Sequence, residues 1–312
     1  MMRHLLRDDD LTPAEQAEVL ELAAAMKAEP YARRPLEGPQ TVAMVFDKPT
    51  LRTQASFAAG VAELGGFPMV VDGRLAGIGE RESVADVARI LGRQASAIAW
   101  RTFAQSDLED MAEHAGVPVV NALTDDFHPC QLLADLVTVR EHKPELAGLT
   151  VTFFGDGACN MGNSWLLAGA TAGMHVRISA PEGYTPPAEV FERAGEIGEQ
   201  TGGSATWVED PREAAEGTDV VVTDTWVSMG KEEEAAARTE VFAPYSVTQA
   251  LFETANPDAI AMHCLPAYRG KEIAAEVLDG IQSVVWDEAE NRRHAQKAVL
   301  AWLLERAGTG ER

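Results

Sequence analysis

The sequence predicts an α/β protein made of two Rossmann-like domains, each with a doubly wound parallel sheet, joined by a long helix. Short apolar runs alternate with longer amphipathic stretches, which is the pattern expected where helices cover both faces of a parallel sheet. The alternation restarts after the helical stretch 128–142. The length of 312 residues also suits two domains of ordinary size.

The first half opens with a predicted helix, for which Thr12 is a suitable N-cap and Pro13 a suitable first-turn residue. Its apolar positions at helical spacing are Val19, Leu20, Ala23 and Met26. Strands are expected at 41–46, 68–72, 97–100 and 117–122. Between the second and third of these, the stretch 82–94 has one apolar helical face, formed by Val84, Val87, Ala88 and Leu91.

The second half repeats this organisation. Strands are expected within 149–157, 175–183, 205–210, 218–226, 259–267 and 283–291, and a final helix follows at 290–306. We therefore expect one domain at 1–142, completed by the C-terminal helix 289–312, and a second domain at 143–288.

The composition restricts the classes of partner. Lys and Arg number 26 against 49 Asp and Glu, which gives a formal charge of −23. Such a field repels polyanions, so we expect no nucleic acid as a partner. No apolar window is long enough for a membrane span, and the N-terminus has no apolar signal-peptide core. Three cysteines without CxxC spacing form no disulfide framework, and a cytoplasmic protein is expected.

The stretch KPTLRTQASF follows the first apolar run and begins a helix pattern at once. We expect Thr50, Leu51, Arg52 and Thr53 in its first turn. A helix N-terminus has unpaired N–H groups and a positive dipole end, so it suits a phosphate. Hydroxyls and a guanidinium would complete an anion site. An ordinary N-cap with an exposed arginine is the alternative.

A second group of polar residues follows the next strands. Arg101 comes after a buried strand, and Pro129 at the first helical position places His128 near a helix cap with Gln131 inside the first turn. The positive helix end disfavours imidazolium, so a neutral His128 can donate to a carbonyl oxygen. A histidine that only caps the helix is the alternative.

Three stretches of the second half also follow apolar strands: GDGACNMG, DTWVSMG and HCLPAYRG. Asp224 can hold an ammonium, and Asn160 can hydrogen-bond a carboxylate. Ser228 and Met229 would lie in a loop that closes over a ligand. Each feature taken singly is also consistent with a turn or a cap, and Cys264 with a small buried apolar residue.

The stretch GDGACNMG does not match a dinucleotide site. The fingerprint G-x-G-x-x-G requires a third glycine where this chain has Asn160, and no acidic strand end follows about 20 residues on. We therefore expect no nicotinamide cofactor and no bound nucleotide.

Taken together, four stretches resemble the aspartate/ornithine carbamoyltransferase family, and within it the members that use ornithine: HPCQ (128–131, within FHPCQLLADL), DTWVSMG, HCLPAYRGKEI and WDEAENRRHAQKA. The similarity runs nearly from end to end. It implies two Rossmann-like domains, the first binding carbamoyl phosphate and the second ornithine, in a homotrimer or a multiple of trimers with active sites at subunit interfaces.

The resemblance also implies residue roles. The carbamoyl phosphate residues it implies are Thr50, Leu51, Arg52, Thr53, Arg101, His128, Gln131, Cys264, Leu265 and Arg292. Of these, the catalytic residues are Arg101, His128, Cys264 and Arg292. The ornithine residues are Asn160, Asp224, Ser228 and Met229.

The activity that the resemblance implies is carbamoyl transfer from carbamoyl phosphate to the δ-amine of L-ornithine, giving L-citrulline and phosphate, in arginine biosynthesis. It requires no metal or organic cofactor. Transfer to putrescine or to an N-acylated ornithine is the alternative within the same chemistry. A binding or regulatory relative without catalytic activity is the alternative of another class.

The phosphate loop departs from the family pattern, which is usually S-T-R-T-R. Leu51 stands for a threonine and Gln54 for an arginine, while Gly77 stands where a glutamine reaches the neighbouring subunit's phosphate. A hydrogen bond to a charged group contributes about 1.5–3 kcal/mol. The sequence therefore predicts weaker side-chain contact with the phosphate. A leucine at this loop position also resembles the pattern of carbamoyltransferases that act on N-acylated ornithine, whereas DTWVSMG resembles the free-ornithine pattern.

Overall fold

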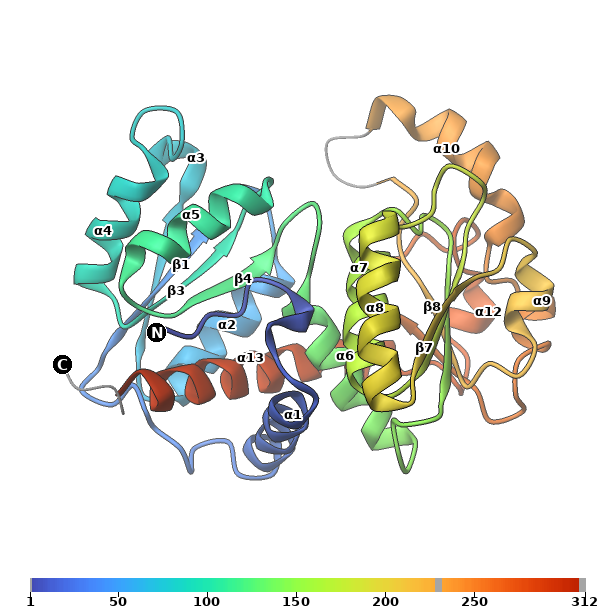
Figure 1. The fold of residues 1–312 in the computed structure, drawn as a ribbon, viewed down its shortest axis with the longest axis horizontal. Helices are drawn as coiled ribbons and strands as arrows, with labels where there is room; N and C mark the ends of the chain where they lie inside the picture. The colour runs from blue at the N-terminus through green and yellow to red at the C-terminus, as the bar shows by residue number, and fades with distance from the viewer. Residues whose placement is uncertain (1, 228–231, 309–312) are drawn as a thin grey trace. The chain divides into compact units, whose positions relative to one another are not determined.

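The computed structural model describes residues 2–227 and 232–308 (Figure 1). The chain forms two compact units. The first comprises Met1–Val137 and Glu290–Arg312, and the second comprises Thr138–Ala289. Each unit is built on its own parallel sheet, which confirms the predicted fold class.

The first unit contains a four-stranded sheet in the order β2-β1-β3-β4. Its strands are β1 (Thr41–Phe46), β2 (Phe67–Asp72), β3 (Ala97–Arg101) and β4 (Val119–Leu123), and all pair in parallel. Helix α2 (Arg52–Glu63) packs against β1 and β2, whereas α4 (Val84–Gln94) and α5 (Gln105–Ala115) pack on the other face. The sheet is therefore covered on both faces, and the carboxyl ends of its strands share one edge.

The predicted opening helix is α1 (Pro13–Ala28), and its cap is as expected. The Thr12 hydroxyl accepts from the Glu15 N–H, and the Glu15 carboxylate accepts from the Thr12 N–H. This reciprocal capping box satisfies two donors that the helix itself cannot. The predicted apolar positions of α1 are buried: Val19, Leu20, Ala23 and Met26.

The second unit contains a five-stranded parallel sheet in the order β7-β6-β5-β8-β9. Its strands are β5 (Thr150–Phe154), β6 (His175–Ser179), β7 (Ser204–Trp207), β8 (Val220–Thr223) and β9 (Ile260–His263). Helices α7 (Asn160–Thr171) and α8 (Ala188–Thr201) pack together against β5, β6 and β7. Figure 1 shows α7 and α8 next to each other on one side of this sheet.

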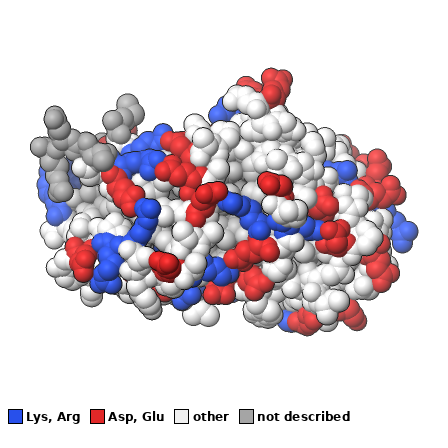
Figure 2. Space-filling view, turned by 90° about the horizontal axis from the view of Figure 1, so that it is seen from below, with Lys and Arg blue, Asp and Glu red and all other residues white. Residues whose placement is uncertain are grey.

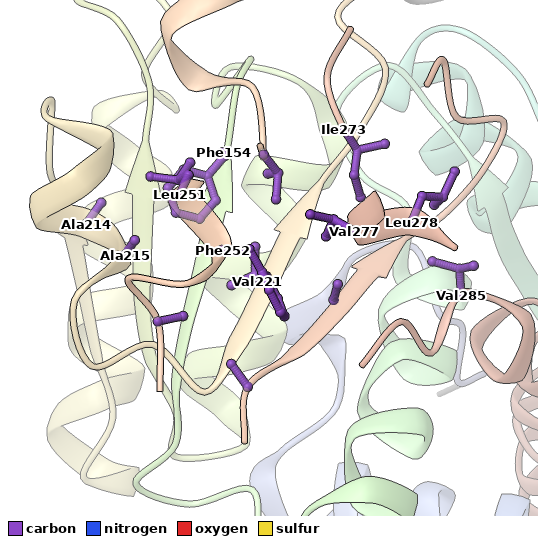
Figure 3. Close-up of a cluster of buried hydrophobic side chains, with 14 residues drawn as sticks. Phe154, Ala214, Ala215, Val221, Leu251, Phe252, Ile273, Val277, Leu278 and Val285 are labelled. Carbon is purple, nitrogen blue, oxygen red and sulfur yellow. The ribbon is translucent and has the colours of Figure 1, made fainter. Parts of the chain in front are cut away.

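A second apolar core lies on the opposite face of this sheet (Figure 3). Phe154 of β5 and Val221 of β8 contribute from the strands, and Leu251, Phe252 and Val277 contribute from short helices. These helices are α9 (Pro211–Ala215), α11 (Gln249–Phe252) and α12 (Ala275–Leu278). Burial on both faces explains why β8 and β9 are almost continuously apolar in the sequence.

The remaining elements are short turns and helices together with two long helices. They are the 3-10 turns η1 (Asp8–Asp10), η2 (Glu232–Glu234) and η3 (Ala243–Tyr245), and the helices α3 (Gly73–Ala76), α6 (Pro129–His142), α10 (Ala235–Phe242) and α13 (Val285–Gly308). The predicted helix starting beside His128 is thus α6.

Two local expectations were wrong. The stretch 283–291 was expected to be a strand, but Ser283 forms a single bridge with Ala261 and helix α13 begins at Val285. The acidic residues that follow favour a helix N-terminus because of its positive dipole end. In addition, α2 begins at Arg52, so Thr50 lies before the helix and Leu51 is its N-cap.

The charged side chains are mixed in sign on the face seen in Figure 2, where Lys and Arg are interspersed among Asp and Glu. Within residues 2–227 and 232–308, no helix has the length and hydropathy needed to cross a membrane.

Candidate active site

The loop between β1 and α2 is held by contacts on both of its flanks. The Asp47 N–H donates to the Arg101 carbonyl (2.9 Å), and the Trp100 indole N–H donates to the Asp47 carboxylate (2.7 Å). Lys48 is nearly buried, forms an ion pair with Asp125 and places its ammonium 4.3 Å from the ring centroid of Phe103. These contacts hold the loop that leads to the α2 N-terminus.

Two arginines converge on one hydroxyl at the α2 N-terminus. Arg101 Nη1 and Arg292 Nη2 each lie 3.3 Å from Thr53 Oγ1. Arg101 is the last residue of β3, and Arg292 comes from α13, far along the chain. All three side chains are buried. The site therefore concentrates positive charge in a chain whose net charge is −23.

Gln131 extends this group. Its Oε1 accepts from Arg292 Nη1 (2.5 Å), and its Nε2 donates to Asp135 Oδ1 (2.7 Å). The direction of the second bond fixes the amide, so the Gln131 oxygen faces the guanidinium. Buried polar groups joined in this way keep a single arrangement because any other leaves one of them unsatisfied.

His128 precedes α6, as predicted, and its carbonyl accepts from the Gln131 N–H (2.9 Å). Burial lowers the pKa of His128 well below its ordinary value, and the charges of Arg292 and Arg101 lower it further. The imidazole is therefore neutral at physiological pH. A neutral ring that lies near two guanidinium groups can donate one N–H to a carbonyl oxygen without adding a third positive charge.

The second unit places its predicted residues at strand ends. Asp224 directly follows β8 and Cys264 directly follows β9, and the Cys264 thiol donates to Asp224 Oδ1 (3.2 Å). The same carboxylate oxygen accepts from the Thr225 N–H (2.7 Å). Asn160 is the first residue of α7. The carboxylate and the amide are thus presented at the carboxyl edge of the sheet, where ligands bind in open α/β folds.

A fully buried histidine shapes the segment after β9. His263 Nδ1 accepts from the Leu265 N–H (2.9 Å), so Nε2 carries the proton and faces Glu272 Oε1 at 3.3 Å. The His263 N–H donates to Glu288 (2.9 Å). Leu265 has φ +59°, which a non-glycine residue adopts only where its surroundings hold it. These bonds fix the backbone that carries Cys264.

Asp224, His263 and Cys264 offer possible metal ligands within 4.8 Å of one another. However, both ring nitrogens of His263 already have partners, Leu265 and Glu272. A metal ion would have to displace one of these bonds. The arrangement therefore favours a role in shaping the segment over one in metal binding.

The structure brings Thr53, Arg101, Gln131 and Arg292 of the predicted set into direct contact. Leu51 instead projects its side chain outward, with 77% of its surface exposed, and caps α2 without a side-chain hydrogen bond. Ser228 and Met229 lie outside the described residues.

Sequence reasoning missed the residues that support the site. They are Asp135, Asp156, Arg238, His263, Glu272 and Glu288. All of them except Arg238 lie within stretches quoted in the sequence analysis, but no motif in the sequence shows which of them pair in the folded chain.

Comparison with known proteins identifies this arrangement. Residues 3–141 match the family domain described as "Aspartate/ornithine carbamoyltransferase, carbamoyl-P binding domain", and residues 147–303 match the one described as "Aspartate/ornithine carbamoyltransferase, Asp/Orn binding domain". The chain belongs to the aspartate/ornithine carbamoyltransferase family. The predicted resemblance is thereby confirmed.

Relatives within the carbamoyltransferase family are similar over their whole length. The chain is 61% identical to the ornithine carbamoyltransferase of Clavibacter michiganensis subsp. michiganensis, over 97% of this chain and 99% of the relative. It is 58% identical to that of Renibacterium salmoninarum, over 98% and 100% respectively.

Solved structures of the family agree with the fold. The ornithine carbamoyltransferase of Pyrococcus furiosus superposes with a TM-score of 0.93 at 41% identity, over 99% of this chain and 98% of that chain. The anabolic ornithine carbamoyltransferase of Campylobacter jejuni subsp. jejuni has a TM-score of 0.92 at 34% identity, over 98% and 100%.

Proposed function

We propose that the chain transfers the carbamoyl group of carbamoyl phosphate to the δ-amine of L-ornithine, giving L-citrulline and phosphate. The observation that carries the proposal is the convergence of Arg101 and Arg292 on Thr53 at the N-terminus of α2, with a neutral His128 nearby. Such a cluster suits a ligand that carries both an anionic group and a carbonyl group, whose oxygen these side chains can polarise. The relatives at 54–61% identity named as ornithine carbamoyltransferases support ornithine as the acceptor.

Carbamoyl phosphate binds through the α2 N-terminus and Arg52, with Thr50 and the backbone N–H of Leu51 beside them. The helix dipole and unpaired N–H groups stabilise the phosphate. Arg101, His128 and Arg292 hydrogen-bond the carbonyl oxygen. Their strongest interaction is with the negative charge that develops there as the amine adds.

Ornithine binds through Asp224, which orients the α-amino group, and Asn160, which holds the carboxylate. By analogy with the family, Ser228 and Met229 complete the acceptor side, and Leu265 belongs with Cys264 to the carbamoyl phosphate residues beside the reacting amine. The neutral δ-amine forms a C–N bond with the carbonyl carbon, and the C–O bond to phosphate breaks with its electron pair leaving on phosphate. The amine proton passes to a phosphate oxygen or to solvent beside Cys264. Catalysis thus depends mainly on positioning and charge stabilisation.

The choice of acceptor is tested by product formation from purified protein and carbamoyl phosphate with L-ornithine, putrescine or N-acetylornithine in parallel. Turnover with ornithine at least about a hundredfold above the other amines supports the proposal, since loss of a paired charge costs several kcal/mol. Preferred use of N-acetylornithine would move the assignment to the acylated substrate, for which the exposed Leu51 is the favouring observation.

A homotrimer is proposed for the assembly. The edge strand β2 and the adjoining α3 expose large apolar side chains, among them Phe67 (57%), Val70 (49%) and Leu75 (83%). A second copy of the chain would cover such a surface. Light scattering should then give three times the chain mass of 33.6 kDa, or a multiple of it.

The proposed setting is arginine biosynthesis in the cytoplasm. The Campylobacter jejuni relative is described as anabolic, which supports this direction. Expression of the chain should restore growth without arginine to a strain that lacks its own ornithine carbamoyltransferase. Failure of an expressed, active protein to do so would contradict the biosynthetic role.

A further inference from the structure

Arg238 is a buried arginine on α10 that the proposed mechanism does not use. It is 5% exposed although it lies on a short helix of the second unit. Its guanidinium forms an ion pair with Asp156, and its Nε donates to the Trp226 carbonyl (2.6 Å). Arginine is suited to this task because its planar group donates in several directions at once.

Two of the partners of Arg238, Asp156 and the Trp226 carbonyl, each lead to one ornithine-binding residue, whereas the third, Glu234, lies one turn away at 3.4 Å. Asp156 lies in the turn after β5, and its Oδ1 accepts from the Ala158 N–H (3.2 Å), two residues before Asn160. One carboxylate oxygen therefore shapes the turn that starts α7, while the other binds the guanidinium. The position of Asn160 depends on this turn.

The other partner belongs to the segment that carries Asp224. Trp226 lies two residues after Asp224, and its backbone carbonyl accepts from Arg238. Its indole packs against Gly155, where an added Cβ would approach the ring nitrogen to 3.2 Å. The segments after β5 and β8 are thus in close contact, and a glycine at 155 permits it.

Two aromatic rings hold the guanidinium in place. The Arg238 Cζ lies 5.6 Å from the ring centroid of Tyr184 and 5.2 Å from that of Phe242. The faces of aromatic rings attract a cation, and a desolvated pair contributes more than an exposed one. Arg238 therefore has little freedom to adopt another rotamer.

We propose that Arg238 is a positioning residue that sets the separation of Asn160 and Asp224 by joining the segment after β5 to the segment after β8. It acts on the substrate through Asp156 and Trp226 and does not touch it. The inference rests on the proposed function, because it assigns these two residues to the amino-acid acceptor.

The experiment compares Arg238→Lys, Arg238→Met and Asp156→Asn with the wild type. Lysine keeps the charge but cannot bond both partners, and methionine keeps only the apolar stem. Arg193→Met is the matched control, since Arg193 is a partly exposed arginine of the same unit that pairs with Glu196. KM for ornithine, KM for carbamoyl phosphate, kcat and the unfolding temperature are measured for each.

The expected result is a rise of about ten- to hundredfold in the ornithine KM of all three variants. Their KM for carbamoyl phosphate should stay within about twofold of the wild-type value, and so should both KM values of the control variant. The double variant Arg238→Met, Asp156→Asn should be little worse than either single one, because the two residues act as one unit. An unchanged ornithine KM in folded Arg238→Lys, or equal rises in both KM values with a lowered unfolding temperature, would overturn the inference.

Calorimetry with L-norvaline separates this inference from the proposed function. Norvaline has the α-amino and carboxylate groups of ornithine without the reacting amine. In the presence of carbamoyl phosphate, norvaline should bind Arg238→Lys more weakly than it binds the wild type. This result supports the positioning role regardless of how fast either protein turns over. Equal binding contradicts it. Wild-type protein that binds norvaline but makes no citrulline would instead contradict the proposed reaction.

Discussion

The Arg292 guanidinium donates to the Gln131 Oε1 at 2.5 Å and thereby joins α13 to the first turn of α6 within the first unit. Its other terminal nitrogen lies 3.3 Å from Thr53 Oγ1 at the start of α2. One arginine from the last helix thus connects two segments of the site. The first half of the chain cannot form this constellation without the C-terminal helix.

Arg292→Lys should lower kcat by about a hundredfold, because an ammonium cannot bond Gln131, Thr53 and a substrate oxygen from one plane. Arg101→Ala should have at least as large an effect on turnover. Initial rates at saturating substrates measure both. Arg89→Ala is the control and should keep wild-type rates, because Arg89 lies at an exposed position of α4. Near-normal turnover in folded Arg101→Ala would remove that residue from the mechanism.

Leu51→Thr should tighten carbamoyl phosphate binding by about tenfold, since it adds a hydroxyl at the N-cap of α2 beside the proposed phosphate. Calorimetric titration measures this. Its companion Gly77→Gln should not tighten binding. Gly77 has φ +67°, and a Cβ there would meet the Arg81 Cβ at 2.9 Å, so a side chain strains the turn. Unchanged affinity in Leu51→Thr would show that the backbone alone serves at this position.

His294 should make the protein less stable in acid. Burial lowers its pKa from 6.5 to about 4, and the cations Arg293, Lys297 and Lys27 act in the same direction. The unfolded chain therefore takes up a proton below pH 6.5 that the folded chain does not. His294 therefore lowers the free energy of unfolding by up to about 1.4 kcal/mol per pH unit as the pH falls from 6.5 to about 4.

His294→Gln should remove this contribution, so that its free energy of unfolding falls less steeply than that of the wild type over the same range. Urea titrations at several pH values measure the slope. His128, whose pKa is also lowered, keeps its own contribution in both proteins. Parallel slopes for the two proteins would contradict a neutral, buried His294.

Cys264 should be the first thiol to react with iodoacetamide near pH 8. Burial raises the pKa of Cys130 to about 12 and the pKa of Cys159 well above its ordinary value. The thiolate is the reactive form, so both are protected. Mass spectrometry should find the label on Cys264, and a bound amino-acid substrate should slow it. Labelling of Cys264→Ala at the wild-type rate would refute this order.

Much of the fold could be predicted from the sequence because local signals agreed with the tertiary structure. The capping box at Thr12, Pro129 at the start of α6 and the buried strands all follow from short-range patterns. The stretch 283–291 was misread because a brief β-branched run precedes acidic residues that favour a helix start.

The supporting residues could not be predicted, for a physical reason. Arg238 and Asp156 are 82 positions apart, and their pairing depends on how β5 and β8 align in the sheet. The Glu272–His263 contact likewise depends on the path of the chain after β9. Patterns in the sequence locate strand ends and helix starts, but buried pairs between distant segments arise only in the folded chain.

The most direct measurement follows carbamoyl phosphate labelled with carbon-13 at its carbonyl group, with L-ornithine and purified protein, by NMR and phosphate assay together. The expected result is one labelled citrulline for each phosphate released, with label in the ureido carbon. Phosphate release without labelled citrulline, or no consumption of carbamoyl phosphate at all, would contradict carbamoyl transfer to ornithine.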